Sequence, residues 1–141
     1  MGAYSVSGSQ NVAAAPGATV VAVEAATTIR GKLFFFLVAA QGIPDASNTP
    51  LWRVRRFSAP GTRTPVTPEP FDPADPGAIL TAGENHTVEP TYTTGLFNPI
   101  PLNQRAIYQW NAHPNKEFLI PAVAGAGIGI SAENAAYAGE A

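Results

Sequence analysis

Apolar and polar residues alternate along much of the chain, which is typical of half-buried β-strands. In residues 50–58, Trp52 and Val54 fall on one face, while Arg53 and Arg55 fall on the other. Such alternation or short apolar runs predict strands over 18–25, 29–42, 50–58, 105–112, 117–122 and 125–132. No stretch combines a sustained 3.6-residue periodicity with a cap at each end, so no helix is expected.

Strands separated by Gly, Pro and Asn turns predict an all-β, antiparallel sandwich or barrel. Residues 1–141 fit a single domain of this kind. The segment 29–42 is apolar at successive positions from Leu33, so this strand is expected to be buried on both faces. In the segment 125–132, alternating glycines favour close approach of another backbone or a bulky side chain.

The segment 64–77 carries five prolines, a density that excludes a helix and a central strand. The stretch 81–103 looks rich in loops. Together they predict a proline-rich arm or loop excursion over about 59–103, inserted between core strands. Because excursions of this length are usually functional or disordered, and this one contains many apolar residues, we expect it to pack on its own sandwich or on a neighbouring subunit.

The composition narrows the classes of function. Charged residues make up 13% of the chain, against roughly 25% for an ordinary soluble domain, which favours a surface covered by partners. The net charge of -2 argues against direct binding of nucleic acid. The longest apolar run, 33–40, is too short to span a bilayer, and the first residues lack the basic start of a secretory signal. We therefore expect no insertion into a membrane.

Candidate chemistry is sparse. Glu84, His86 and Glu89 lie close in sequence, but their spacing fits no metal motif, and a turn with polar side chains is the simpler interpretation. His113 has no nucleophile or base partner suggested by spacing. The glycines of 125–130 do not fit a dinucleotide fingerprint. We expect no catalytic residues, no metal and no cofactor.

Two charged clusters and several aromatic residues are candidates for an interface. The basic cluster is Arg53, Arg55, Arg56 and Arg63, and the acidic one is Glu69, Asp72 and Asp75. They are either solvated, or the carboxylates of one subunit pair with the arginines of another. Phe71 is the expected anchor of the arm. Tyr92 and Phe97 are further candidates, since aromatic side chains on a sandwich can also stack on sugars.

The order of the segments resembles that of the small β-sandwich head decoration, or cement, proteins of tailed bacteriophages. The resemblance covers about residues 18–132 and rests on "TVVAVEAATTIRGKLFFFLVAAQG", "PLWRVRRFSAPGT", "HTVEPTYT", "IYQWNAHPNKEFLIP" and "AGAGIGISAE". It implies a jelly-roll-like sandwich without enzymatic activity. It also implies that the major capsid protein is the partner, that a homotrimer forms, and that the protein sits on the capsid surface of the virion after assembly in the host cytoplasm. The alternative is a carbohydrate- or receptor-binding sandwich of a phage tail or fibre.

Overall fold

The computed structural model describes residues 2–10, 18–40 and 50–133. Every regular element in these ranges is a β-strand. The strands are β1 (Tyr4–Ser5), β2 (Ala18–Glu24), β3 (Gly31–Leu33), β4 (Phe35–Ala39), β5 (Leu51–Ala59), β6 (Thr62–Val66), β7 (Glu69–Pro70), β8 (Thr81–Val88), β9 (Thr91–Gly95), β10 (Ile100–Pro101), β11 (Ile107–Asn111), β12 (Phe118–Ile120) and β13 (Gly127–Glu133). A helix able to cross a bilayer does not occur in these ranges.

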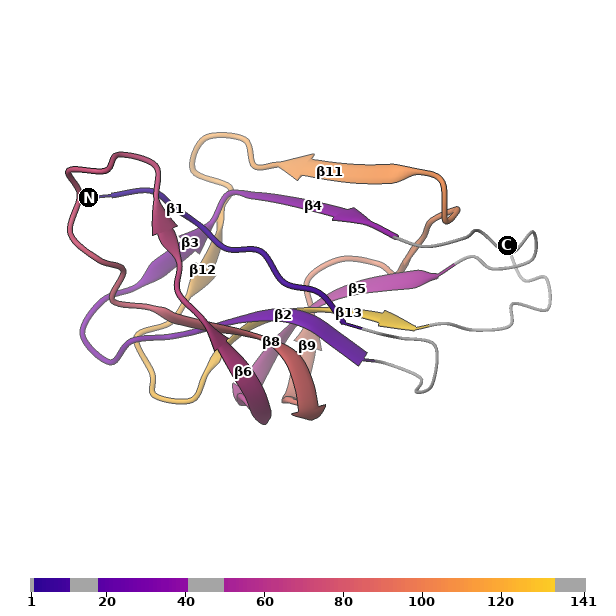
Figure 1. Cartoon of the computed structure of the whole chain (residues 1–141), viewed down its shortest axis with the longest axis horizontal. Coiled ribbons are helices and arrows are strands. Elements are labelled where there is room, and N and C mark those ends of the chain that lie inside the picture. The colour runs from indigo at the N-terminus through magenta and orange to yellow at the C-terminus, as the bar shows by residue number, and fades with distance from the viewer. Residues whose placement is uncertain (1, 11–17, 41–49, 134–141) are drawn as a thin grey trace.

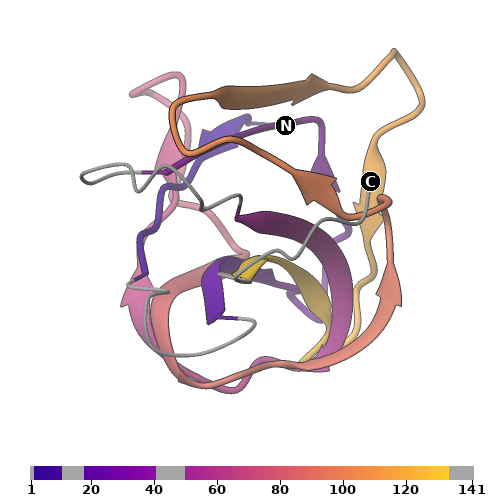
Figure 2. The ribbon, with the colours of Figure 1, turned by 90° about the vertical axis from the view of Figure 1, so that its right-hand side faces the viewer.

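The strands form two layers (Figure 1). The larger sheet has the order β10-β5-β13-β2-β8-β6, and β9 also pairs with β5. The smaller layer consists of the pairs β4–β11 and β3–β12. Every strand pair is antiparallel. Seen end on, the larger sheet curls below the flatter β4–β11 pair (Figure 2). The predicted all-β antiparallel sandwich is therefore confirmed.

The hydrophobic core lies between the two layers. Its buried members include Phe36, Val38, Trp52, Val54, Ile120, Ile128 and Ile130. Along β5, Trp52 and Val54 are buried and Arg53 and Arg55 are half-buried, as the alternation predicts. Tyr108 and Trp110 pack on this core from β11, with Trp110 stacked on Phe36 at 5.5 Å between ring centroids.

The prediction of one doubly buried strand over 29–42 is wrong. The segment forms two strands, β3 and β4, which are separated at Phe34. Within β4, Phe36 and Val38 are buried, whereas Phe35 and Leu37 are 40% and 49% exposed. A run that is apolar at every position hides this alternation, because the outer face is apolar as well. Residues 41–42 lie outside the described part.

The expected excursion over 59–103 is also wrong for most of its length. It contains β6, β7, β8, β9 and β10, and β8 is an internal strand between β2 and β6. Even the proline-rich segment joins the sheet, since Pro65 of β6 pairs with Gly83 of β8. Proline is tolerated there because β6 is an edge strand and needs donors on one side only. Residues 71–80 are the longest stretch of 59–103 that contains no strand.

The "ENHTVEP" stretch is not a turn. Glu84, Asn85, His86 and Thr87 belong to β8, and His86 is buried. Asn85 has a φ of 49°, in the left-handed region that asparagine tolerates better than most residues. The register between β6 and β8 shifts beside it, between Thr62 and Thr64. Sequence periodicity cannot reveal a strand that is broken by such an irregularity.

Candidate functional site

The outer face of the β4–β11 pair is exposed and largely apolar, with Gln109 and Asn111 as its polar members on β11. In this pair, Ile107 lies opposite Ala39, and Leu37 lies opposite Gln109. Leu37 is 49% exposed and Ile107 66%, and Phe35 lies on the same face of β4. We call Phe35, Leu37, Ala39 and Ile107 the β4–β11 outer face. Neighbouring exposed apolar side chains of this kind mark interaction surfaces more often than isolated ones do.

A second exposed feature is the turn that follows β7, residues 71–75, which we call the Phe71 turn. Phe71 is 61% exposed, and its ring meets that of Phe34 edge to face at 6.4 Å. Asp72 and Asp75 lie in the turn, and Glu69 precedes it in β7. The three carboxylates form no ion pair with any residue in 2–10, 18–40 or 50–133.

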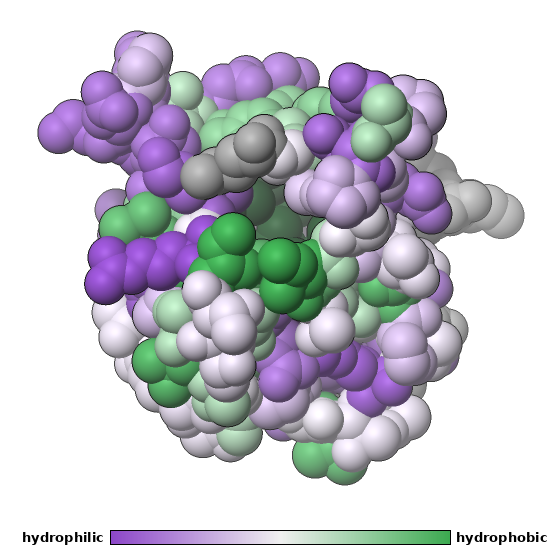
Figure 3. Space-filling view, turned by 90° about the vertical axis from the view of Figure 1, so that its left-hand side faces the viewer, coloured by the Kyte–Doolittle hydropathy of each residue, from purple (hydrophilic) through white to green (hydrophobic). Residues whose placement is uncertain are grey.

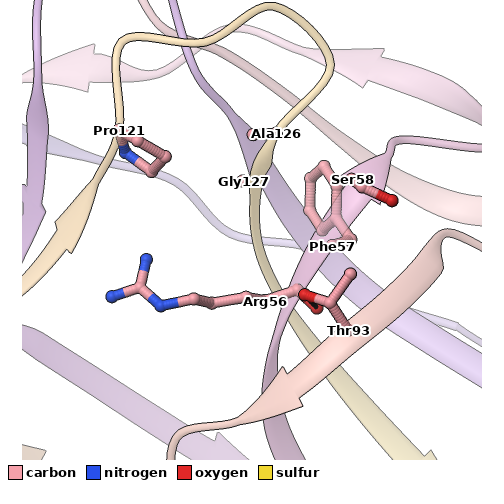
Figure 4. A pocket seen from close by; sticks show the side chains of 7 residues that line it. All are labelled: Arg56, Phe57, Ser58, Thr93, Pro121, Ala126 and Gly127. Carbon is pink, nitrogen blue, oxygen red and sulfur yellow. Dashed lines mark hydrogen bonds between the residues drawn. The ribbon is translucent and has the colours of Figure 1, made fainter.

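Two shallow hollows share Arg56 and Pro121 in their linings. The first has a volume of about 240 Å³ and is lined by Arg56, Phe57, Ser58, Thr93, Pro121, Ala126 and Gly127 (Figure 4). The second, of about 320 Å³, is lined by Arg30, Arg56, Leu119, Pro121 and Ala122. We call the second the Arg30–Arg56 hollow. It combines two guanidinium groups with apolar walls, so it suits an apolar group accompanied by negative charge.

The other three arginines of the predicted basic cluster bind within their own chain. Arg53 Nε lies 3.0 Å from Glu133 Oε1. Arg63 forms an ion pair with Glu24. Arg55 lies over the ring of Tyr92, 3.8 Å from its centroid, and donates to Ser131 Oγ at 2.9 Å. None of these partners belongs to the acidic cluster of Glu69, Asp72 and Asp75. The role of the three arginines in an interface stays a prediction.

Tyr92 closes a polar network on the side of the larger sheet that faces away from the core. Its hydroxyl lies 2.5 Å from Thr19 Oγ1, and Thr19 donates in turn to the Glu89 carboxylate. The Thr19 backbone N–H also donates to both Glu89 oxygens, at 3.0 and 3.1 Å. Burial raises the pKa of Tyr92, which keeps its hydroxyl protonated and able to donate. The network ties β2, β9 and the end of β8 together.

The glycines of β13 admit bulky side chains, as predicted. A Cβ on Gly129 would lie 2.7 Å from the Tyr92 hydroxyl, and a Cβ on Gly127 would overlap the ring of Phe57. Both neighbours belong to the same chain. The glycine pattern of β13 therefore serves internal packing rather than contact with another subunit.

Phe97 packs inside the molecule. Its ring contacts those of Phe36, Trp110 and Phe118 edge to face, with centroids 5.2 to 5.5 Å apart. Trp52 is buried, and Arg55 covers the ring of Tyr92. Buried Trp52 agrees with the alternation in β5, and neither Tyr92 nor Phe97 presents the open ring face that the alternative of sugar stacking would need. Aromatic content alone could not distinguish packed rings from exposed ones.

His86 is buried on β8, and neither of its ring nitrogens has a hydrogen-bond partner in the described part of the chain. Burial is the main influence on its pKa and lowers it; nearby Glu89 opposes the shift and Arg63 adds to it. Within the described residues there is no group of three or more His, Cys, Asp or Glu residues that could hold a metal ion.

We predict that His86 makes the fold sensitive to mild acid. In the unfolded chain, His86 binds a proton below about pH 6.5, whereas its burial in the folded chain opposes protonation. The contribution of neutral His86 to stability is therefore fully present above that pH and is lost as the pH falls below it. Each pH unit in the window between the two pKa values costs up to about 1.4 kcal/mol. Thermal unfolding of wild type and His86→Gln between pH 7.5 and 5 measures this.

The His86→Gln variant should have a flatter dependence of Tm on pH than the wild type. The exposed residue His113 provides the matched control, because His113→Gln should keep the wild-type dependence. Equal slopes in the wild type and the His86 variant would show that His86 is not the sensitive group.

Comparison with known proteins gives no relative from which a role could be transferred. No protein-family model, no curated protein and no solved structure matches this chain.

Proposed function

We propose that this protein is a structural virion protein that binds the outer surface of a phage capsid and bridges its subunits. The observation that carries the proposal is the β4–β11 outer face. An apolar row on a two-stranded layer of the sandwich is costly to leave in water, and a protein partner would remove that cost. The major capsid protein is the proposed partner, and the capsid surface of the virion is the proposed location.

The order of the sequence segments supports the same proposal, because it resembles that of phage head decoration proteins and the expected antiparallel sandwich is present. The jelly-roll-like connectivity and the homotrimer belong to the proposal. On a shell of many identical subunits, contacts that are individually weak add up through multivalency, so a modest apolar face suffices for stable attachment. No catalytic step is part of this function.

Co-sedimentation with heads of the source phage assembled without this protein tests the proposal. We expect the wild type to pellet with the heads and to saturate them at a fixed ratio. Leu37→Ser with Ile107→Ser should weaken binding at least about tenfold, since apolar anchors dominate such interfaces. The matched control is Val88→Ser, which removes a side chain that is 56% exposed on β8, outside the β4–β11 outer face.

Two results would contradict the proposal. One is a wild-type protein that stays in the supernatant at every concentration of heads. The other is a double variant that binds as well as the wild type, which would remove the β4–β11 outer face from the interface.

A further inference from the structure

The Phe71 turn is held together by hydrogen bonds within its own chain. The N–H of Asp75 donates to the carbonyl of Asp72 at 2.9 Å, and Asp72 Oδ1 accepts from the N–H of Ala74 at 2.9 Å. Three prolines, at 70, 73 and 76, restrict the backbone further. A preorganised segment loses little conformational entropy on binding.

The start of the chain also holds the turn in place. The Phe71 N–H donates to the carbonyl of Ala3 at 2.8 Å, and the Tyr4 hydroxyl donates to the carbonyl of Pro76 at 2.7 Å. The turn therefore presents an exposed aromatic ring on a fixed support, with carboxylates beside it.

The Arg30–Arg56 hollow has the opposite charge and an apolar wall. Arg30 is exposed, Leu119 is 44% exposed, and Arg56 donates to the carbonyl of Leu119, which holds its guanidinium in the hollow. Neither arginine forms an ion pair within the ranges that the structure describes. Guanidinium groups bind carboxylates through paired, charge-assisted hydrogen bonds.

The turn and the hollow lie at the same end of the molecule, and within one chain Asp72 and Asp75 form no ion pair with Arg30 or Arg56. Strand β3 separates Arg30 from Phe34, the residue that supports Phe71, by about 13 Å at the rise of an extended strand. Viewed from this end, hydrophobic residues gather near the centre with hydrophilic groups on both sides (Figure 3). Each copy thus carries both halves of a complementary contact.

We propose that the Phe71 turn of one copy of this chain docks in the Arg30–Arg56 hollow of a second copy. Phe71 lies against Leu119 and Pro121, and the turn carboxylates meet Arg30 and Arg56. A second copy is the occupant that the charges favour, because one surface supplies the carboxylates and the other the guanidiniums. The contact is heterologous, so repetition links copies head to tail and closes a ring when the rotation allows. The contact between copies rests on the proposed function only in the role that the oligomer would have on the capsid.

Sedimentation velocity of the purified protein, without heads, tests this contact. We expect the wild type to self-associate and Phe71→Ser to raise the dissociation constant at least about tenfold. Asp75→Arg, whose carboxylate makes none of the hydrogen bonds described for the turn, and Arg30→Glu should each weaken association similarly, and the chain that carries both changes should recover it, because the charges are then exchanged. The matched control is Val88→Ser, which should associate as the wild type does. Circular dichroism checks that each variant is folded.

Recovery of association in the chain that carries both changes would support the contact. If the two residues mattered only for the fold of their own chain, the losses caused by the two changes would add up instead. Three results would overturn it: a wild type that is monomeric throughout, single variants that associate normally, or a double variant without recovery. If the wild type is monomeric alone but Phe71→Ser loses binding to heads, the turn binds capsid protein, and the self-contact fails while the proposed function stands.

Discussion

Replacing Phe36 by alanine is expected to destabilise the protein by about 3–5 kcal/mol, the usual range for removing a buried phenylalanine. Phe36 is 4% exposed, and its ring contacts those of Phe97, Tyr108 and Trp110. The cavity would open at the centre of the aromatic cluster, where side chains of both layers meet. Chemical denaturation followed by tryptophan fluorescence measures the loss, because Trp110 stacks on Phe36.

Phe35 provides a matched control for this prediction. It precedes Phe36 in the same strand but points outward and is 40% exposed. Phe35→Ala should cost about 1 kcal/mol, well below the cost at Phe36, since less buried area is lost and no enclosed cavity is left. Equal losses at the two positions would contradict the assignment of the inner and outer faces of β4.

Replacing Gly127 by alanine is the second change with a large expected effect, about 3 kcal/mol or more, at the upper end of the range for overpacking. The added Cβ would overlap the carbonyl oxygen of Val23 in β2 and the ring of Phe57 in β5. One of these neighbours is backbone within a paired sheet, so it cannot move without breaking the pairing of β13 with β2. Thermal unfolding measures the effect.

Gly77→Ala is the control, because a Cβ at Gly77 would meet no atom within 4 Å. We expect this variant to melt within a degree or two of the wild type. A Gly127 variant that is as stable as the wild type would show that β13 does not approach β2 and Phe57 as closely as described.

The sequence predicts the fold class because strand signals act locally. The alternation of Trp52 and Val54 with arginines reports directly which side of β5 is buried. The glycines of β13 likewise predict close packing, and Phe57 and Tyr92 provide it. These features depend on few neighbours, so periodicity and residue size suffice to predict them.

The missed features depend on pairing between distant segments. β8 is an internal strand because β2 and β6 flank it, and neither partner can be recognised from the polar sequence of β8 itself. Arg63 and Glu24 are 39 positions apart in sequence, so their ion pair has no local signal. The β4–β11 outer face escaped prediction because Leu37 and Ile107 have the same apolar character as the core residues beside them.

The most direct test of the proposed attachment is hydroxyl-radical footprinting of the protein, free and bound to phage heads, because the method reports the solvent exposure of individual side chains. We predict that Phe35, Leu37 and Ile107 react in the free protein and are protected on the heads, while Val88 reacts equally in both states. Unchanged reactivity of these three residues on saturated heads would contradict attachment through the β4–β11 outer face.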